Sequence, residues 1–226
     1  MIPKKKHSIW VGKQNKPSLV RRCEQSWKKQ CKDYQFIEWN EQNFNITEAP
    51  RYVQEAYTMK KWAFVSDYIR LWALYHHGGI YLDSDMELLK PLDCFLSHKS
   101  FSGFEDATHI QTGVIGAEKG NAIIKELLES YVDKKFILDK GLNQTTNVIT
   151  VTKMLEKKGL LKNNKAQLLL ENLQIYPSEY FCPMSFETGQ IQVTNNTYAI
   201  HHFSASWLSL KKRISLKIGR FLRRNK

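Results

Sequence analysis

The segment from Met59 to Leu82 constrains the fold of this chain more than any other part of its sequence. Two apolar stripes run along it at helical spacing, formed by Trp62, Val65, Ile69 and Trp72 and by Phe64, Tyr68, Leu71 and Tyr75. A helix that is apolar on two sides is typical of a helix buried in a protein core. Gly78–Gly79 ends the helical pattern, and Ile80–Leu82 reads as a short strand. We therefore expect a buried helix over Met59–His77 that leads directly into a strand of a sheet.

Strands and helices alternate along the rest of the chain. The expected strands cover Lys4–Val11, Tyr34–Trp39 and Tyr198–His201, and the expected helices cover Ser18–Cys31, Ala122–Tyr131 and approximately Val148–Lys157. Ser18, directly after Pro17, is expected to cap the first of these helices. A loop-rich region is expected around Tyr176, Phe181 and Pro183. The succession of strand, helix and strand predicts a parallel βαβ unit, so the fold class is α/β with one interrupted sheet.

The positive charge of the chain is concentrated at its C-terminal end. The 226 residues carry a formal net charge of +12. Residues 208–226 contain eight basic side chains and no acidic one, so residues 1–207 carry only +4 (12 − 8). This length fits one domain, which we expect at residues 1–207, followed by a basic tail at 208–226. Because the excess charge belongs to the tail, and no helix-turn-helix, RRM or zinc-finger pattern is present, we expect no binding to nucleic acid.

The tail combines its basic residues with an apolar face. Leu210, Ile214, Ile218 and Phe221 would lie on one side of a C-terminal helix. A basic amphipathic helix suits an anionic membrane surface, and a solvated tail or one docked on another subunit is the alternative. No run approaches the roughly 18 apolar residues that span a bilayer, and the first residues lack the apolar stretch of a secretory signal. We therefore expect a cytoplasmic protein that is peripheral on the inner face of a bacterial cell membrane.

Asp83 and Asp85 follow the predicted strand and are separated by one residue. In extended backbone, residues i and i+2 point the same way, so both carboxylates can face one cation. Oxygen ligands suit Mg²⁺ or Mn²⁺, and ligands gather at the carboxyl ends of strands in open α/β sheets. Two aspartates at this spacing are, by themselves, more often a solvated acidic turn. The prediction of a metal site therefore depends on their surroundings.

Asp67 and Arg70 lie one helical turn apart on the helix that is apolar on two sides. Burying a charged side chain is costly unless it is paired or directed toward a ligand. Two interpretations are open. Either the two residues form a structural ion pair within the helix, or both project into a pocket and hydrogen-bond sugar hydroxyls, with Arg70 able to contact a phosphate as well.

A resemblance to a known family rests on this segment and on its flanks. WAFVSDYIRLWALYHHGGIYLDSDM resembles the signature of the DXD-containing sugar transferases, family 32 of the glycosyltransferases, which includes bacterial capsule and lipopolysaccharide enzymes. IPKKKHSIWVG, YQFIEWNEQNF and YAIHHFSASW are similar to that family's opening strand, second strand and closing segment, so the matches spread over residues 2–207. The resemblance implies a GT-A-type single Rossmann-like domain with a mixed central sheet. It also implies a nucleotide-sugar donor, a divalent metal, retention of anomeric configuration and a role in surface polysaccharide biosynthesis.

The resemblance implies a set of donor-binding residues. The set is Trp10, Asp67, Arg70, Asp83, Ser84 and Trp207. Within it, Trp10 would stack on the nucleobase and Trp207 would lie over the diphosphate. Asp67 and Arg70 would hold the donor sugar. A UDP-sugar is expected in preference to a GDP-sugar.

The resemblance further implies a metal site and an acceptor side. Asp83, Asp85 and His201 would hold Mn²⁺ or Mg²⁺, with His202 as the alternative to His201. The implied catalytic residues are Asp67, Arg70, Asp83 and Asp85. Gln111 and Thr112, within HIQTGVIGAEKGN, would lie near the acceptor. The acceptor is expected to be a saccharide or a lipid-linked molecule.

The chain departs from the family near Thr146, where TTNVIT stands in place of a frequent Gly-Pro. That region shapes the acceptor side, which is therefore the least defined part of the inference. No carboxylate stands out as a nucleophile, so same-face attack by the acceptor hydroxyl is the expected route to retention. Two other classes are kept as alternatives: a metal-dependent phosphotransferase or nuclease, and a basic nucleic-acid-binding module.

Overall fold

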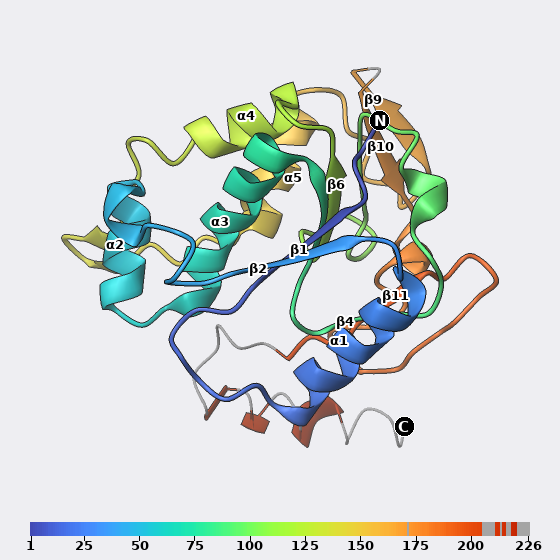
Figure 1. Ribbon diagram of the computed structural model, residues 1–226, viewed down its shortest axis with the longest axis horizontal. Coiled ribbons are helices and arrows are strands. Elements are labelled where there is room, and N and C mark those ends of the chain that lie inside the picture. Colours follow the sequence, from blue (N-terminus) through green and yellow to red (C-terminus); the bar gives the residue numbers. More distant parts are fainter. Residues whose placement is uncertain (171, 205–210, 213, 216–217, 221–226) are drawn as a thin grey trace.

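A mixed sheet of seven strands forms the centre of the protein (Figure 1). This computed structural model describes residues 1–226 except 171, 205–210, 213, 216–217 and 221–226. In sheet order the strands are β2 (Gln35–Trp39), β1 (Lys5–Ile9), β3 (Gly79–Leu82), β6 (Val114–Ala117), β5 (Ser100–Gly103), β10 (Leu173–Tyr176) and β9 (Gln167–Leu169). Strands β2, β1 and β3 are parallel, β6 runs antiparallel to both of its neighbours, β10 is parallel to β5, and β9 is antiparallel to β10. The predicted mixed central sheet and the N-terminal parallel βαβ unit are confirmed.

Helices cover both faces of this sheet. They are α1 (Ser18–Gln30), α2 (Arg51–Thr58), α3 (Trp62–His77), α4 (Ala122–Glu129) and α5 (Asn147–Glu156), with short 3-10 turns at Ile46–Glu48, Asp93–Phe95 and Ser178–Tyr180. Helix α3 contacts α2, α4 and strand β1, whereas α1 contacts the small sheet described below (Figure 1). Strand β3 separates two cores because its side chains alternate. Tyr81 belongs to the core with α3, and Ile80 and Leu82 belong to the core with α1.

Two small antiparallel pairs accompany the central sheet. Strand β4 (Met86–Leu88) pairs with β11 (Ala199–His201), and β7 (Ile137–Leu138) pairs with β8 (Gly141–Leu142). In the first pair, His201 lies opposite Met86. Strand β11, which lies late in the chain, is therefore next to the segment that directly follows β3.

Two glycines allow α3 to lead directly into β3. Gly78 and Gly79 both have positive φ, at 61° and 118°. A Cβ atom on Gly79 would lie 2.5 Å from the carbonyl oxygen of Lys5 on the neighbouring strand. Only glycine combines this backbone conformation with so close an approach. The predicted stop after His77 is confirmed.

Three predictions about local structure are wrong in detail. The helix expected from Met59 begins at Trp62, because the chain is interrupted at Lys60 in a left-handed conformation (φ 55°) and residues 51–58 form the separate helix α2. Ser18 is the first residue of α1 and not its cap; the N-cap position is held by Pro17, whose side chain cannot accept a hydrogen bond. Tyr176 ends strand β10 and does not lie in a loop, because its backbone pairs with Gly103.

The tail is described only in part. Residues 211–212, 214–215 and 218–220 are helical, and the side chains of Ile214 and Ile218 are 50% and 56% exposed. Trp207, Leu210 and Phe221 lie outside the described residues. In the described part of the chain, every helix is too short or too polar to cross a membrane.

Candidate functional site

The Asp-Ser-Asp segment forms a tight turn between β3 and β4. Strand β3 ends at Leu82, and the backbone N–H of Met86 donates to the carbonyl oxygen of Asp83 at 3.0 Å. The extended geometry expected for Asp83 and Asp85 is therefore wrong, because the chain reverses direction here. Both carboxylates nevertheless lie close to His201, because the turn is held between strands β3 and β4. The backbone N–H of Asp83 also donates to the carbonyl oxygen of Gly113, at 2.8 Å.

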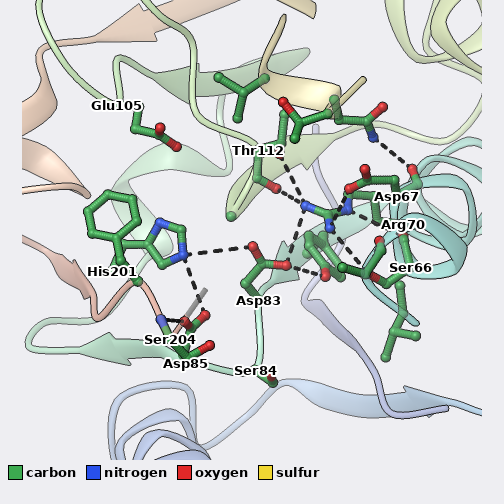
Figure 2. Close-up of a pocket in the computed structure, with 18 of the residues that line it drawn as sticks. Ser66, Asp67, Arg70, Asp83, Ser84, Asp85, Glu105, Thr112, His201 and Ser204 are labelled. Carbon is green, nitrogen blue, oxygen red and sulfur yellow. Dashed lines mark hydrogen bonds and ion pairs between the residues drawn. The ribbon is translucent and has the colours of Figure 1, made fainter. Parts of the chain in front are cut away.

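Asp83, Asp85 and His201 form a group whose ligand atoms all lie within 4.8 Å of one another. The Nε2 atom of His201 lies 3.4 Å from Oδ1 of Asp85 and 4.0 Å from Oδ2 of Asp83 (Figure 2). The other oxygen of Asp85 accepts a hydrogen bond from the backbone N–H of Ser204 at 2.7 Å. The pairing of β4 with β11 is what brings the histidine to the aspartates.

The charges of this group stabilise one another. Burial disfavours the charged forms of both His201 and Asp85, but their mutual attraction outweighs it. The pKa of His201 is consequently raised well above its usual value. The pKa of Asp85 is lowered by His201 and by the N–H of Ser204. The group therefore stabilises a positive charge at the imidazole ring of His201, beside the two carboxylates.

The donor atoms of this group fit a divalent cation. Carboxylate oxygens and an imidazole nitrogen are ligands that Mn²⁺ accepts, and Mg²⁺ favours the oxygens. The Nδ1 atom of His201 is buried and has no hydrogen-bond partner among the described residues. The Nε2 atom of the same ring already faces both carboxylates, so a cation bound there would take the place of the imidazolium proton.

His202 faces away from this group. Its Nε2 atom lies 2.7 Å from Oε2 of Glu87 and 3.3 Å from a guanidinium nitrogen of Arg22. Of the two adjacent histidines, His201 is therefore the one that the structure places beside Asp83 and Asp85.

Arg70 connects the group of possible metal ligands to helix α3. One guanidinium nitrogen lies 2.8 Å from Oδ1 of Asp67, and another lies 3.3 Å from Oδ1 of Asp83. The second nitrogen also donates to the carbonyl and hydroxyl oxygens of Thr112, at 2.7 and 3.2 Å. The hydroxyl of Tyr81 donates to Oδ1 of Asp83, and the Tyr81 ring lies under the guanidinium. Arg70 thus contacts both carboxylates and holds them in position (Figure 2).

Asp67 and Arg70 form the i, i+3 ion pair and also line one cavity, and their binding of a sugar stays a prediction. Burial raises the pKa of Asp67 to about 6, although Arg70 opposes the change. The side chain of Asn147 secures this helix turn by donating to the carbonyl oxygen of Asp67 at 2.8 Å. The ion pair is therefore structural and also accessible from the cavity.

The cavity has a volume of about 340 Å³, within the range of small-molecule sites. The predicted residues in its lining are Asp67, Arg70, Asp83, Ser84, Asp85, Thr112 and His201. Trp10 and Gln111 are not in the described lining: the indole N–H of Trp10 donates to the carbonyl oxygen of Gln14, and the amide of Gln111 binds Ser102 and Val114. Trp207 lies outside the described residues. The roles of these residues in donor and acceptor binding stay predictions.

The cavity also contains residues that the sequence analysis did not single out. Asn147 and Glu105 both contribute to its wall, as does Gly113. A Cβ atom on Gly113 would lie 3.2 Å from Oδ2 of Asp83. Glycine at this position therefore allows the residue before β6 to lie close to the residue after β3. A glycine within a strand pattern is a sequence signal for such an approach. Asn147 and Glu105 carry no comparable signal.

A protein-family model matches part of the chain, including the Asp-Ser-Asp segment. Residues 17–102 match the model of the family described as "Glycosyltransferase sugar-binding region containing DXD motif". Residues 17–102 are such a region. The predicted DXD-motif glycosyltransferase is confirmed at this level, and the assignment to family 32 fits the match.

Individual proteins are also similar to this chain. An uncharacterized protein of Arabidopsis thaliana is 30% identical over 136 residues, which cover 58% of this chain but only 19% of that protein. The solved structure named PaToxG Glycosyltransferase is 19% identical, with 70% of each chain covered and a TM-score of 0.55. A glycosyltransferase involved in the glycosylation of the major capsid of PBCV-1 is 12% identical, with 94% of this chain and 99% of that chain covered and a TM-score of 0.48. Together with the mixed sheet, the likeness to PaToxG supports the predicted GT-A-type fold.

Proposed function

We propose that this protein transfers a sugar from a nucleotide-sugar donor to an acceptor, with the help of a divalent cation. The observation that carries the proposal is the convergence of Asp83, Asp85 and His201 at a cavity that also contains the Asp67–Arg70 pair. This convergence occurs at the DXD turn of a matched glycosyltransferase region.

The cavity offers contacts for the sugar and for the diphosphate of such a donor. Asp67 and Arg70 would hydrogen-bond the hydroxyls of the sugar, and Ser84 lines the same space. The first turn of α5, from residue 146 to 149, contributes to the wall as well. Helix N-termini attract phosphate through their free backbone N–H groups. The wall of the cavity therefore offers hydrogen-bonding groups to a sugar and a helix N-terminus to an anionic diphosphate.

Asp83, Asp85 and His201 would hold the cation. When bound, it would supply positive charge that stabilises the departing nucleoside diphosphate. Arg70 would keep Asp83 in position by its ion pair at 3.3 Å. Ser204 would keep Asp85 in position through its backbone N–H, and both contacts exist before the donor arrives.

The finer parts of the proposal rest on the resemblance to family 32. They are a UDP-sugar donor, retention of configuration, and a saccharide or lipid-linked acceptor in the biosynthesis of a surface polysaccharide. The two-part organisation at residues 1–207 and 208–226, with the basic tail on the inner face of a membrane, belongs to the same proposal. Exposed Ile214 and Ile218 beside Lys211 and Lys212 support a surface-binding tail.

Donor hydrolysis tests the proposal most directly. We would incubate the protein with UDP- and GDP-sugars in the presence of Mn²⁺, Mg²⁺ or EDTA and measure release of the nucleoside diphosphate. Slow release from one donor that stops with EDTA is the expected result. Release of a sugar phosphate would favour a phosphotransferase instead, and the absence of both hydrolysis and metal-dependent nucleotide binding would contradict the proposal.

The substitution Asp85→Asn tests the cation site. It keeps the size of the side chain but removes a negative charge, so we expect metal-dependent donor hydrolysis to fall by more than about 100-fold, since even residues outside the metal ligands alter activity by about 10–100-fold. Asp139→Asn is the matched control, because Asp139 is exposed and outside the cavity. Full activity of Asp85→Asn would remove this residue from the site.

A further inference from the structure

A second cavity adjoins the donor cavity. Its volume is about 820 Å³, and the two share Glu105 and Phe186 in their walls. The second cavity is enclosed by segments around residues 105–106, 164–166, 177–187 and 192–194. A saccharide bound in the larger cavity could therefore contact a donor sugar bound in the smaller cavity.

Glu105 lies where the two cavities meet, and its carboxyl group is not part of the hydrogen-bond network of the donor cavity. Its backbone N–H donates to the carbonyl oxygen of His109 at 2.7 Å. Its carboxyl group has no hydrogen bond or ion pair with any residue that the structure describes. Figure 2 shows it apart from the dashed network that joins Asp67, Arg70, Asp83 and His201. Burial raises the pKa of Glu105, although the nearby charge of His201 opposes the change, so this carboxyl group is partly desolvated.

The wall of the second cavity is acidic and polar. Its charged residues are Glu105, Asp106, Glu179 and Glu187 against Lys165, with Arg220 stacked over Phe186 at the shared edge. Carboxylates accept hydrogen bonds from hydroxyl and ammonium groups but repel other carboxylates and phosphates. The ring of Phe186 adds an apolar surface suited to the face of a sugar. This chemistry fits a saccharide that is uncharged or carries an amino group.

We propose that the second cavity is the acceptor cleft, that its substrate is an uncharged or amino-bearing saccharide, and that Glu105 accepts a hydrogen bond from the attacking hydroxyl. This inference rests on the proposed function. The acceptor oxygen forms a bond to the anomeric carbon while the bond from that carbon to the phosphate oxygen breaks. The nucleoside diphosphate leaves with the electron pair and receives the hydroxyl proton, and Glu105 orients the hydroxyl throughout.

Saccharide binding without a donor tests the cleft separately from transfer. The probes are cellobiose, the chitosan dimer and cellobiouronic acid, which share a β-1,4 linkage and differ in charge. Saturation-transfer NMR should detect cellobiose or the chitosan dimer with at least tenfold tighter binding than cellobiouronic acid. Equal or preferential binding of the acid, or binding of none of the three, would overturn the proposed acceptor class.

Filling the cavity tests its location. Ala166 is exposed and lines only the second cavity, so Ala166→Trp should abolish the binding of the preferred saccharide. Ala122→Trp is the matched control, at the exposed start of α4, and should bind like the unmodified protein. Unfolding temperatures of both variants establish that they are folded. Undiminished binding by a folded Ala166→Trp variant would show that the saccharide lies elsewhere.

Glu105→Gln tests the contact with the acceptor. The readout is the ratio of sugar transferred to saccharide over donor hydrolysed by water, which a merely structural role would not move. We expect this ratio to fall at least tenfold, and an unchanged ratio would overturn the role of Glu105. If the unmodified protein hydrolyses no nucleotide sugar, the proposed function fails, whereas the binding experiments still decide whether the cleft takes a saccharide.

Discussion

In the donor cavity Arg70 holds Asp67 and Asp83 with its own guanidinium, whereas in the neighbouring cavity Glu105 has no partner among the described residues. The first cavity is built mainly on helices α3 and α5 and on the ends of strands β3 and β11. The second is lined mainly by the segment that precedes β9 and by the segments that follow β10. The donor cavity thus has paired charges on regular elements, and an unpaired carboxyl group lies at its boundary with a cavity lined by loops.

Under the proposed function, this difference separates two tasks. Polar groups that are fixed before a reaction begins need no reorganisation as charge develops, which favours pairing on the side of the departing diphosphate. A group that must recognise a second substrate keeps its hydrogen-bonding capacity for that substrate. Loops are common places for such recognition because they vary without disturbing the core.

The largest effect is expected from breaking the pairing in the donor cavity. Arg70→Lys keeps the positive charge, but a single ammonium group cannot reach Asp67, Asp83 and Thr112 together. Breaking a buried, hydrogen-bonded pair costs about 3–5 kcal/mol, so urea unfolding should show a loss approaching that range. Donor hydrolysis should fall with it.

An exposed pair provides the control for that experiment. Arg51 lies 2.6 Å from Glu55 and is 63% exposed, so Arg51→Lys should change the free energy of unfolding by less than about 1 kcal/mol. If both substitutions destabilise the protein equally, the contrast between buried and exposed pairs does not hold.

An effect of intermediate size is expected from Asp67 on the pH dependence of the free energy of unfolding. Its pKa is raised from 3.8 to about 6, so the folded state binds a proton that the unfolded state has already released between these values. The stability contributed at low pH is therefore lost as pH rises. At about 1.4 kcal/mol per pKa unit, the free energy of unfolding of the unmodified protein relative to Asp67→Asn should fall by up to about 3 kcal/mol between pH 4 and 7.

Asp33 gives the opposite sign and serves as the control. Lys4 lowers the pKa of this exposed carboxyl, so its contribution to stability is present above its usual pKa and is lost as pH falls. Relative to Asp33→Asn, the unmodified protein should become more stable as pH rises. Chemical unfolding at a series of pH values distinguishes the two trends, and parallel trends would contradict the burial effect at Asp67.

The smallest effect on either cavity is expected from the tail. Replacing Lys211 and Lys212 by alanine removes two exposed basic groups, each contributing about 1 kcal/mol near an anionic membrane. Binding to phosphatidylserine vesicles in a flotation assay should weaken by about thirtyfold. The same replacement of Lys28 and Lys29, exposed on α1, should leave vesicle binding unchanged. Equal weakening by both pairs would show that general charge, and not the tail, binds the membrane.

The sequence predicted the donor side better than the second cavity for a physical reason. Asp67 and Arg70 lie on α3, where helical periodicity determines direction, and Asp83 and Asp85 lie in the turn directly after β3. His201 lies far away in the sequence, and only the resemblance indicated it. The structure adds the cause, which is the pairing of β11 with β4.

The parts that were missed depend on contacts that no local pattern contains. Glu105 follows a short strand among other polar residues, and its position between two cavities results from packing with the segment around Phe186. Asn147 is one of several polar residues near the start of α5, and only the folded chain shows its bond to the carbonyl oxygen of Asp67. The break at Lys60 was missed because the apolar stripes continue toward it without a proline or glycine.

The joining of β11 to β4 has a consequence for the order in which the protein is made. Asp85 and Ser204, which hydrogen-bond to each other, are separated by 119 positions. A ribosome therefore releases the DXD turn long before it has synthesised the strand that carries His201. A nascent chain can therefore contain α3 and β3 while the proposed group of cation ligands is incomplete. A translation product that stops before β11 would contain Asp83 and Asp85 without His201.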